Sequence, residues 1–177
     1  MTVYIILFRG VGGATQLPTS PLREALAAAG FGAVRTYINS GNAVLASDLG
    51  PDGVAAGVAR VCRDRFGFDK AIYAIPRAEW AALIAANPFP DAVATPALLH
   101  AGWLAARPEP KKVEAVRSAA VDGERLAVVG RVAYLHTPNG FGPSKMAVRF
   151  DKGIGVASTV RNWNTVRKLM TLADTTE

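Results

Sequence analysis

The chain opens with a strand-like run followed by a helix-like stretch. Residues 3–8 are continuously apolar and rich in β-branched and aromatic side chains, which predicts a buried strand. In residues 20–29 the apolar positions are spaced i, i+3, i+4 and i+7, which is typical of a helix that buries one face. Ser20 is the expected N-cap, Pro21 suits the first turn, and Gly30 is the expected stop.

The next segments predict two strands, a helix and a fourth strand. Residues 34–39 and 42–46 form the two strands, and Ser40-Gly41 fits a two-residue hairpin in which glycine takes a positive φ. Residues 54–66 have an amphipathic helical pattern, and residues 71–75 form the last strand. The order βαββαβ predicts a ferredoxin-like subdomain in which both helices pack on one face of a sheet.

A second, smaller α+β subdomain is expected after a connecting helix at residues 77–86. Two prolines end that helix, and residues 91–96 are the best linker. The remaining elements predicted from the pattern are strands at 98–105, 124–129 and 132–136 and helices at 109–119, 144–150 and 160–173. We therefore predict an α+β protein with domains at 1–96 and 97–177, the final helix being capped by Ser158 or Thr159.

Composition fits a globular protein of 177 residues, 50% of them hydrophobic and 19% charged. Cys62 is the single cysteine, so no disulfide forms within the chain, and its apolar helical surroundings predict a buried thiol. The apolar N-terminus is short and lacks a basic segment, and no run approaches the roughly 18 apolar residues of a membrane span. We expect a cytoplasmic protein without membrane contact.

Positive charge is concentrated near the C-terminus of this protein, whose net charge is +6. Residues 1–96 carry 8 Lys/Arg against 7 Asp/Glu, whereas residues 141–177 carry 6 against 3. Between residues 144 and 168 a single acid, Asp151, accompanies six basic residues: Lys145, Arg149, Lys152, Arg161, Arg167 and Lys168. Such a region attracts phosphate-bearing ligands, and the alternative is a solvated basic face with no partner.

Two glycine-containing loops are candidate anion sites. In the first, Arg9, Gly10, Gly12 and Gly13 follow a strand, so backbone N–H groups and a guanidinium could face a phosphate. The loop matches neither the dinucleotide fingerprint nor the P-loop, and the alternative is a flexible turn. In the second, Ser144 caps a helix and Lys145 could hold an anion, the alternative being a plain capped helix.

The third candidate is the start of the final predicted helix. Arg161 and Asn162 fall in its first turn, where the helix dipole disfavours a cation unless a partner compensates. Arg161, Asn164 and Lys168 share one face at i, i+3 and i+7. This pattern favours a ligand site, and the alternative is that the asparagines tie neighbouring loops together.

Several segments together resemble one family. They are residues 4–10 (YIILFRG), 36–42 (TYINSGN), 87–89 (NPF), 144–146 (SKM) and 159–166 (TVRNWNTV). In order and spacing they resemble the bacterial family called domain of unknown function 1697, over essentially the whole chain. The resemblance implies two α+β subdomains, the first ferredoxin-like, and implies no established activity. Asn42, which closes the second segment, joins the candidate ligand residues.

The sequence contains few candidate catalytic residues. His100 and His136 fall in predicted strands without neighbours at metal-ligand spacing, so we predict no metal site and no cofactor. No sequence-level base accompanies Ser40 or Ser144. The leading hypothesis is a binding module for a phosphate-containing ligand, either a nucleotide or single-stranded nucleic acid, although the third strand lacks base-stacking aromatics. The alternatives are a small enzyme acting on an anionic metabolite and a protein-interaction adaptor.

Overall fold

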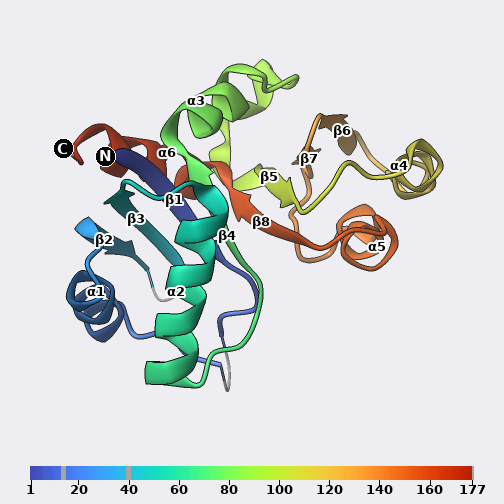
Figure 1. The fold of residues 1–177 in the computed structure, drawn as a ribbon. Helices are drawn as coiled ribbons and strands as arrows, with labels where there is room; N and C mark the ends of the chain where they lie inside the picture. The colour runs from blue at the N-terminus through green and yellow to red at the C-terminus, as the bar shows by residue number, and fades with distance from the viewer. Residues whose placement is uncertain (13–14, 39–40, 177) are drawn as a thin grey trace. The chain divides into compact units, whose positions relative to one another are not determined.

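The protein is a mixed α+β structure, as the sequence pattern predicts. A computed structural model describes residues 1–12, 15–38 and 41–176, which form two four-stranded antiparallel sheets and six α-helices (Figure 1). The chain divides into two compact units. Unit 1 holds Met1–Ala82 together with the segment from Arg167 onward, and unit 2 holds Leu83–Val166. The ranges 1–96 and 97–177 remain a prediction about which segments fold on their own.

The described residues up to Pro76, all of them in unit 1, form four strands and two helices in the predicted order. They are β1 (Thr2–Phe8), α1 (Thr19–Ala28), β2 (Gly32–Tyr37), β3 (Asn42–Ser47), α2 (Pro51–Phe66) and β4 (Ile72–Pro76). The sheet order is β2-β3-β1-β4. Ile5 in the central strand β1 pairs with Val44 on one side and with Ile75 on the other. All neighbouring strands run antiparallel, so β1 and β3 are covered at both edges.

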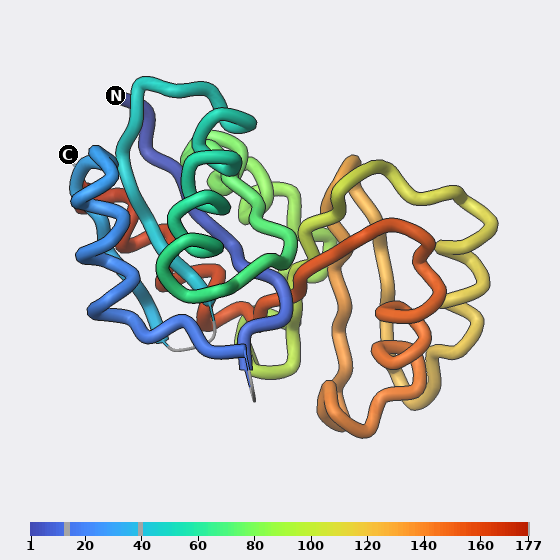
Figure 2. Tube along the Cα trace, turned by 60° about the horizontal axis from the view of Figure 1, so that its bottom comes forward, coloured from blue at the N-terminus to red at the C-terminus, as the bar shows by residue number. Residues whose placement is uncertain are grey.

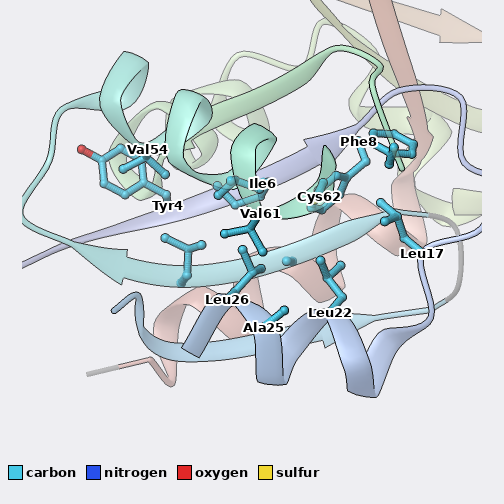
Figure 3. Packing of buried hydrophobic residues seen from close by; sticks show 14 residues of the cluster. Tyr4, Ile6, Phe8, Leu17, Leu22, Ala25, Leu26, Val54, Val61 and Cys62 are labelled. Carbon is cyan, nitrogen blue, oxygen red and sulfur yellow. The ribbon is translucent and has the colours of Figure 1, made fainter. Parts of the chain in front are cut away.

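One face of this sheet packs against α1 and α2. Figure 3 shows Leu22 and Leu26 of α1 and Val61 of α2 pointing toward the β1 side chains Tyr4 and Ile6. The apolar side chains at helical spacing on α1 and α2 therefore pack with the alternate side chains of the strands in one apolar layer. Cys62 lies in this layer with no exposed surface, which confirms the predicted buried thiol, and burial raises its pKa to about 12.

The opposite face of the first sheet carries the C-terminal segment. The row Arg35–Val44–Ile5–Ile75 crosses all four strands on this face, and its three apolar members are fully buried. Arg35 donates hydrogen bonds of 2.7 and 2.8 Å to the hydroxyl and carbonyl oxygens of Thr175. The last turns of the chain therefore lie over this face, and unit 1 is built from both ends of the sequence.

Unit 2 contains a second sheet with the order β6-β7-β5-β8. From Arg77 onward the elements are α3 (Arg77–Ala85), the 3₁₀ turns η1 (Pro90–Ala94) and η2 (Pro96–Leu98), β5 (Leu99–Leu104), α4 (Pro110–Arg117), β6 (Arg125–Val129), β7 (Val132–His136), α5 (Lys145–Gly153), β8 (Ser158–Asn162) and α6 (Trp163–Asp174). Helices α3 and α6 each begin in one unit and end in the other. Helices α4 and α5 lie side by side on one face of this sheet (Figures 1 and 2). Val116, Met146 and Phe150 join the core there and are at most 1% exposed.

Two expectations about the final helix are wrong. The predicted helix 160–173 begins at Trp163, because Ser158–Asn162 pairs with β5 as strand β8. Its cap is neither Ser158 nor Thr159, since the Asn162 side chain accepts a hydrogen bond from the Thr165 N–H at 3.1 Å. Residues 91–96, expected as the linker, are largely 3₁₀ structure, and their role as a linker stays a prediction.

The first helix also begins earlier than expected. It starts at Thr19 after Pro18, so Ser20 lies inside the helix and makes no cap. Gly30 follows the helix with a φ of 93°, as a C-terminal stop requires. Among the described residues, no helix combines the length and apolar character needed to cross a bilayer.

Candidate functional site

The candidate residues chosen from the sequence fall in two units. Arg9, Gly10, Gly12 and Asn42 belong to unit 1, and Ser144, Lys145, Arg161, Asn162 and Asn164 belong to unit 2. Gly13 lies outside the described residues. Their meeting at one cleft stays a prediction, so each set is considered within its own unit.

In unit 1 the glycine loop uses several of its own polar groups. The Arg9 N–H donates to the Ala71 carbonyl at 3.0 Å, and Gly12 and Thr15 exchange two backbone hydrogen bonds of 2.7 and 3.0 Å. Lys70 Nζ donates to the Gly10 carbonyl at 3.3 Å. The Arg9 and Gly12 amides therefore hold the turn together, and the exposed Arg9 guanidinium is a group able to face a ligand.

Asn42 is buried at the first residue of β3. Its side chain is 1% exposed and its amide nitrogen donates to the Tyr37 carbonyl at 3.4 Å, across the hairpin. This contact joins the ends of β2 and β3, so the Asn42 side chain stabilises the turn between them.

In unit 2 the predicted cap at Ser144 is confirmed. Its Oγ accepts a hydrogen bond from the Ala147 N–H at 3.1 Å, and the side chain is almost fully buried. The cap fixes the first turn of α5 and so the direction in which Lys145 leaves the helix. Lys145 itself is exposed.

Replacing Ser144 with alanine is expected to lower the free energy of unfolding by about 1 kcal/mol, because the Ala147 N–H loses its acceptor. Urea unfolding followed by circular dichroism measures the change. Ser118→Ala is the matched control, since the exposed Ser118 hydroxyl merely donates to the Ala115 carbonyl within α4. Equal losses in the two variants would show that the cap contributes nothing specific.

Arg161 lies in strand β8 and not in the first turn of a helix. The helix-dipole argument for a ligand at this position is therefore wrong. Arg161 Nη1 donates to the Thr159 hydroxyl at 2.6 Å and to the Val160 carbonyl at 2.9 Å. Burial lowers the pKa of Arg161 to about 10. Asn162 serves as the cap of α6, and Asn164 is exposed one residue into that helix.

A groove runs between the end of α4 and helix α5, with a volume of about 690 Å³. We call it the basic groove; it is lined by Ser118, Ala119, Val121, Pro143, Lys145, Val148, Arg149, Lys152 and Gly153. Lys145, Arg149 and Lys152 follow one another at i, i+4 and i+7, so they form a stripe along one side of α5. No carboxylate belongs to this lining within the described residues.

The three cations of the groove differ in their partners from most other arginines of unit 2, whose guanidinium groups are hydrogen-bonded. Arg125 makes an ion pair with Asp91 at 2.7 Å, Arg131 donates to the Ala105 carbonyl at 2.8 Å, and Arg117 donates to the Leu126 carbonyl at 3.1 Å. By contrast, in residues 1–12, 15–38 and 41–176 the groove cations have no ion pair or side-chain hydrogen bond. Their charge is available to a ligand.

The basic groove also presents apolar surface. Val148 lies within the cationic stripe and is 50% exposed, while Val121 on the other wall is 51% exposed. Both belong to the small set of large apolar side chains that the described structure leaves in solvent. A ligand that fills the groove therefore meets positive charge and aliphatic surface together.

His100 is a buried titratable side chain of unit 2. It faces the core of unit 2, where its ring stacks on Phe141 with centroids 4.1 Å apart. Its Nδ1 is buried without a hydrogen-bond partner in the part of the chain that the structure describes. Burial lowers the pKa of His100 to about 4, so the imidazole is neutral at physiological pH. No three His, Cys, Asp or Glu side chains among the described residues gather at metal-binding distance.

Comparison with known proteins defines the family. The model for the family described as Protein of unknown function (DUF1697) matches residues 1–134, so the chain belongs to that family, as its motifs indicate. The motifs at 144–146 and 159–166 lie beyond the matched residues.

The fold is also similar to that of a conserved bacterial protein, SP0830, from Streptococcus pneumoniae. The TM-score is 0.74 at 21% sequence identity, and the alignment covers 97% of this chain and 98% of that one. The likeness therefore concerns the fold over both units. No curated protein matches the sequence.

Sequence reasoning counted Arg149 and Lys152 in the cationic region without placing them in a site. The helix was expected to end near residue 150, whereas α5 continues to Gly153. Extending the helical spacing from Lys145 by four and seven residues would have found both positions. The apolar wall at Val121 carries no comparable pattern, because it comes from another segment.

Proposed function

We propose that this protein is a binding module for a ligand with several negative charges, held in the basic groove. The observation that carries the proposal is the stripe of Lys145, Arg149 and Lys152 in a groove whose lining, as far as the structure describes it, contains no acid. Three like charges on adjacent turns of a helix repel one another, and a polyanion relieves this repulsion. The positive net charge of +6 would also speed the encounter with such a ligand.

The groove supports binding better than catalysis. Among the described residues its lining holds no histidine, carboxylate, cysteine or tyrosine, and the hydroxyl it includes there, on Ser118, already donates to a backbone carbonyl. Among the described lining side chains a general base could come only from Lys145 or Lys152, and both are exposed to solvent. The alternative of an enzyme acting on an anionic metabolite has no support from this site.

Single-stranded nucleic acid is the second candidate ligand, and the cationic stripe favours it. Lysine and arginine side chains neutralise phosphates, and an open groove suits a flexible strand. The stripe spans roughly 10 Å from Lys145 to Lys152 at the helical rise, so it can contact more than one phosphate.

The test is a titration of labelled polyanions at several salt concentrations. Single-stranded DNA and a poly-glutamate peptide of equal charge are the probes, followed by fluorescence anisotropy. If three charges contact the DNA strand, the slope of log K against log salt is about −2. Replacing Lys145, Arg149 and Lys152 together with glutamine is expected to weaken the tighter probe about tenfold or more.

A matched control separates the groove from general positive charge. Arg60, Arg63 and Arg65 lie exposed on α2 in unit 1, and their replacement with glutamine removes the same number of positive charges as the groove variant. The proposal requires the control to bind nearly as the parent protein does. Equal weakening in both variants, or no binding of either polyanion at low salt, would refute it.

We also infer that unit 1 is a ferredoxin-like subdomain. The element order β1-α1-β2-β3-α2-β4 and the sheet order β2-β3-β1-β4 support this inference. A bacterial, cytoplasmic setting is part of the proposal, supported by the single cysteine and by the bacterial origin of the similar structure.

A further inference from the structure

We propose that the ligand of the basic groove is an acidic, amphipathic segment of a partner protein. This inference rests on the proposed function and names the chemical class of its ligand. The segment would place carboxylates against Lys145, Arg149 and Lys152 and aliphatic side chains against Val121 and Val148.

The first argument is the mixture of charge and apolar surface in one helical stripe. Lys145, Val148, Arg149 and Lys152 are spaced i, i+3, i+4 and i+7, so the valine lies among the cations. About half of the Val148 and Val121 side chains is exposed to solvent. Covering them with aliphatic groups is favourable by about 25 cal/mol for each Å² of apolar surface removed from water. A ligand of phosphate and sugar alone would cover them without that gain.

The second argument is geometric. One wall is helix α5 and the other is formed by residues 118–121, which directly follow α4. A groove along a helix accepts an amphipathic segment whose anchors recur at i, i+3, i+4 and i+7. The cations at i, i+4 and i+7 rise by about 6 and 4.5 Å along the axis of α5. Glutamates at the same spacing on a helical ligand would face all three cations.

The third argument concerns what the groove lacks. No aromatic side chain belongs to the lining of the groove in the described structure, so nothing there stacks on a nucleobase. The nearby acids, Asp122 and Asp151, are exposed and lie outside the lining. They would repel carboxylates placed off register, which favours a segment whose acids match the stripe.

The experiment uses a displayed library of 15-residue peptides presented to the full-length protein. The residues are drawn from Asp, Glu, Lys, Arg, Leu, Ile, Val and Ser, so acidic and apolar character are selected and not imposed. Enriched peptides are then measured against three variants. The first replaces Lys145, Arg149 and Lys152 with glutamine, the second is Val121→Ser with Val148→Ser, and the third is Val129→Ser.

Val129 provides the matched control, because it is 45% exposed on β6 and does not line the groove. We expect enriched peptides to combine acids with Leu, Ile or Val and to bind at least about tenfold more weakly to the first two variants. Binding to Val129→Ser should match the parent protein. Circular dichroism of each variant confirms that it is folded before binding is compared.

Other results would overturn the inference. Enrichment of peptides without acids, unchanged binding to the double valine variant, or no enrichment at all would each contradict it. If single-stranded DNA binds through the three cations while no peptide is enriched, the anion site stands and the protein partner does not. If neither DNA, poly-glutamate nor any peptide depends on the stripe, both proposals fall.

Discussion

Gly41→Ala is expected to lower the free energy of unfolding by about 2–4 kcal/mol, through two separate effects. The residue has a φ of 79°, where an L side chain costs about 1 kcal/mol. An added Cβ would also lie 2.7 Å from Val11 Cγ2 and 2.9 Å from Phe8 Cβ. Crowding of this kind costs about 1–3 kcal/mol, since Phe8 belongs to the core and cannot move freely. Urea unfolding at neutral pH measures the total.

Gly130→Ala is the control that isolates the backbone effect. Its φ is 60°, and nothing lies within 4 Å of an added Cβ. We expect this variant to lose about 1 kcal/mol, the cost of the left-handed backbone alone. If the two variants lose the same amount, packing around Gly41 is looser than the structure indicates.

Acidification from pH 7 to pH 4 is expected to lower the free energy of unfolding by about 3 kcal/mol through His100 alone. The pKa of this residue falls from 6.5 to about 4 in the folded protein because burial disfavours the imidazolium. The unfolded chain therefore binds the proton first, and the contribution to stability is lost as the pH falls from 6.5 toward 4. Urea unfolding at a series of pH values measures the loss, and His100→Leu should remove most of it.

His136→Gln is the control for this pH dependence. The pKa of His136 is also lowered, first by burial and then by Arg125, but its side chain stays partly exposed. Asp91 does not confuse the comparison, because the hydrogen bond from Arg125 lowers its pKa below 3.8 and its effect on stability falls in more acidic solutions. The His136→Gln variant should keep most of the acid sensitivity of the parent protein. An unchanged pH profile in His100→Leu would contradict the assignment.

Much of the fold could be predicted because local pattern and packing agree. The apolar run at residues 3–8 became β1, and the helical spacing at 54–66 became most of α2, whose inward residues include Val58 and Cys62. The hairpin around Gly130 also follows from its sequence, since glycine there supports the positive φ of a tight turn.

Other features depend on contacts that no local pattern shows. Residues 160–162 were expected to open the final helix, yet pairing with β5 makes Ser158–Asn162 a strand. The helix-dipole argument that made Arg161 a ligand candidate therefore does not apply, because Arg161 lies in a strand. The basic groove was missed in part because one wall comes from the end of α4 and the other from α5. Spacing within α5 could reveal the cations, but not the valine opposite them.

The return of the C-terminal segment to unit 1 has a consequence for synthesis of the protein on the ribosome. Strands β1, β3 and β4 emerge early, yet the C-terminal segment that lies over the face of Ile5, Val44 and Ile75 is added only when the residues after Arg167 have been translated. All of unit 2 is made in the interval. The nascent first sheet thus lacks this segment while about half of the polypeptide is still being added, and exposed apolar surface in such a period is what chaperones protect.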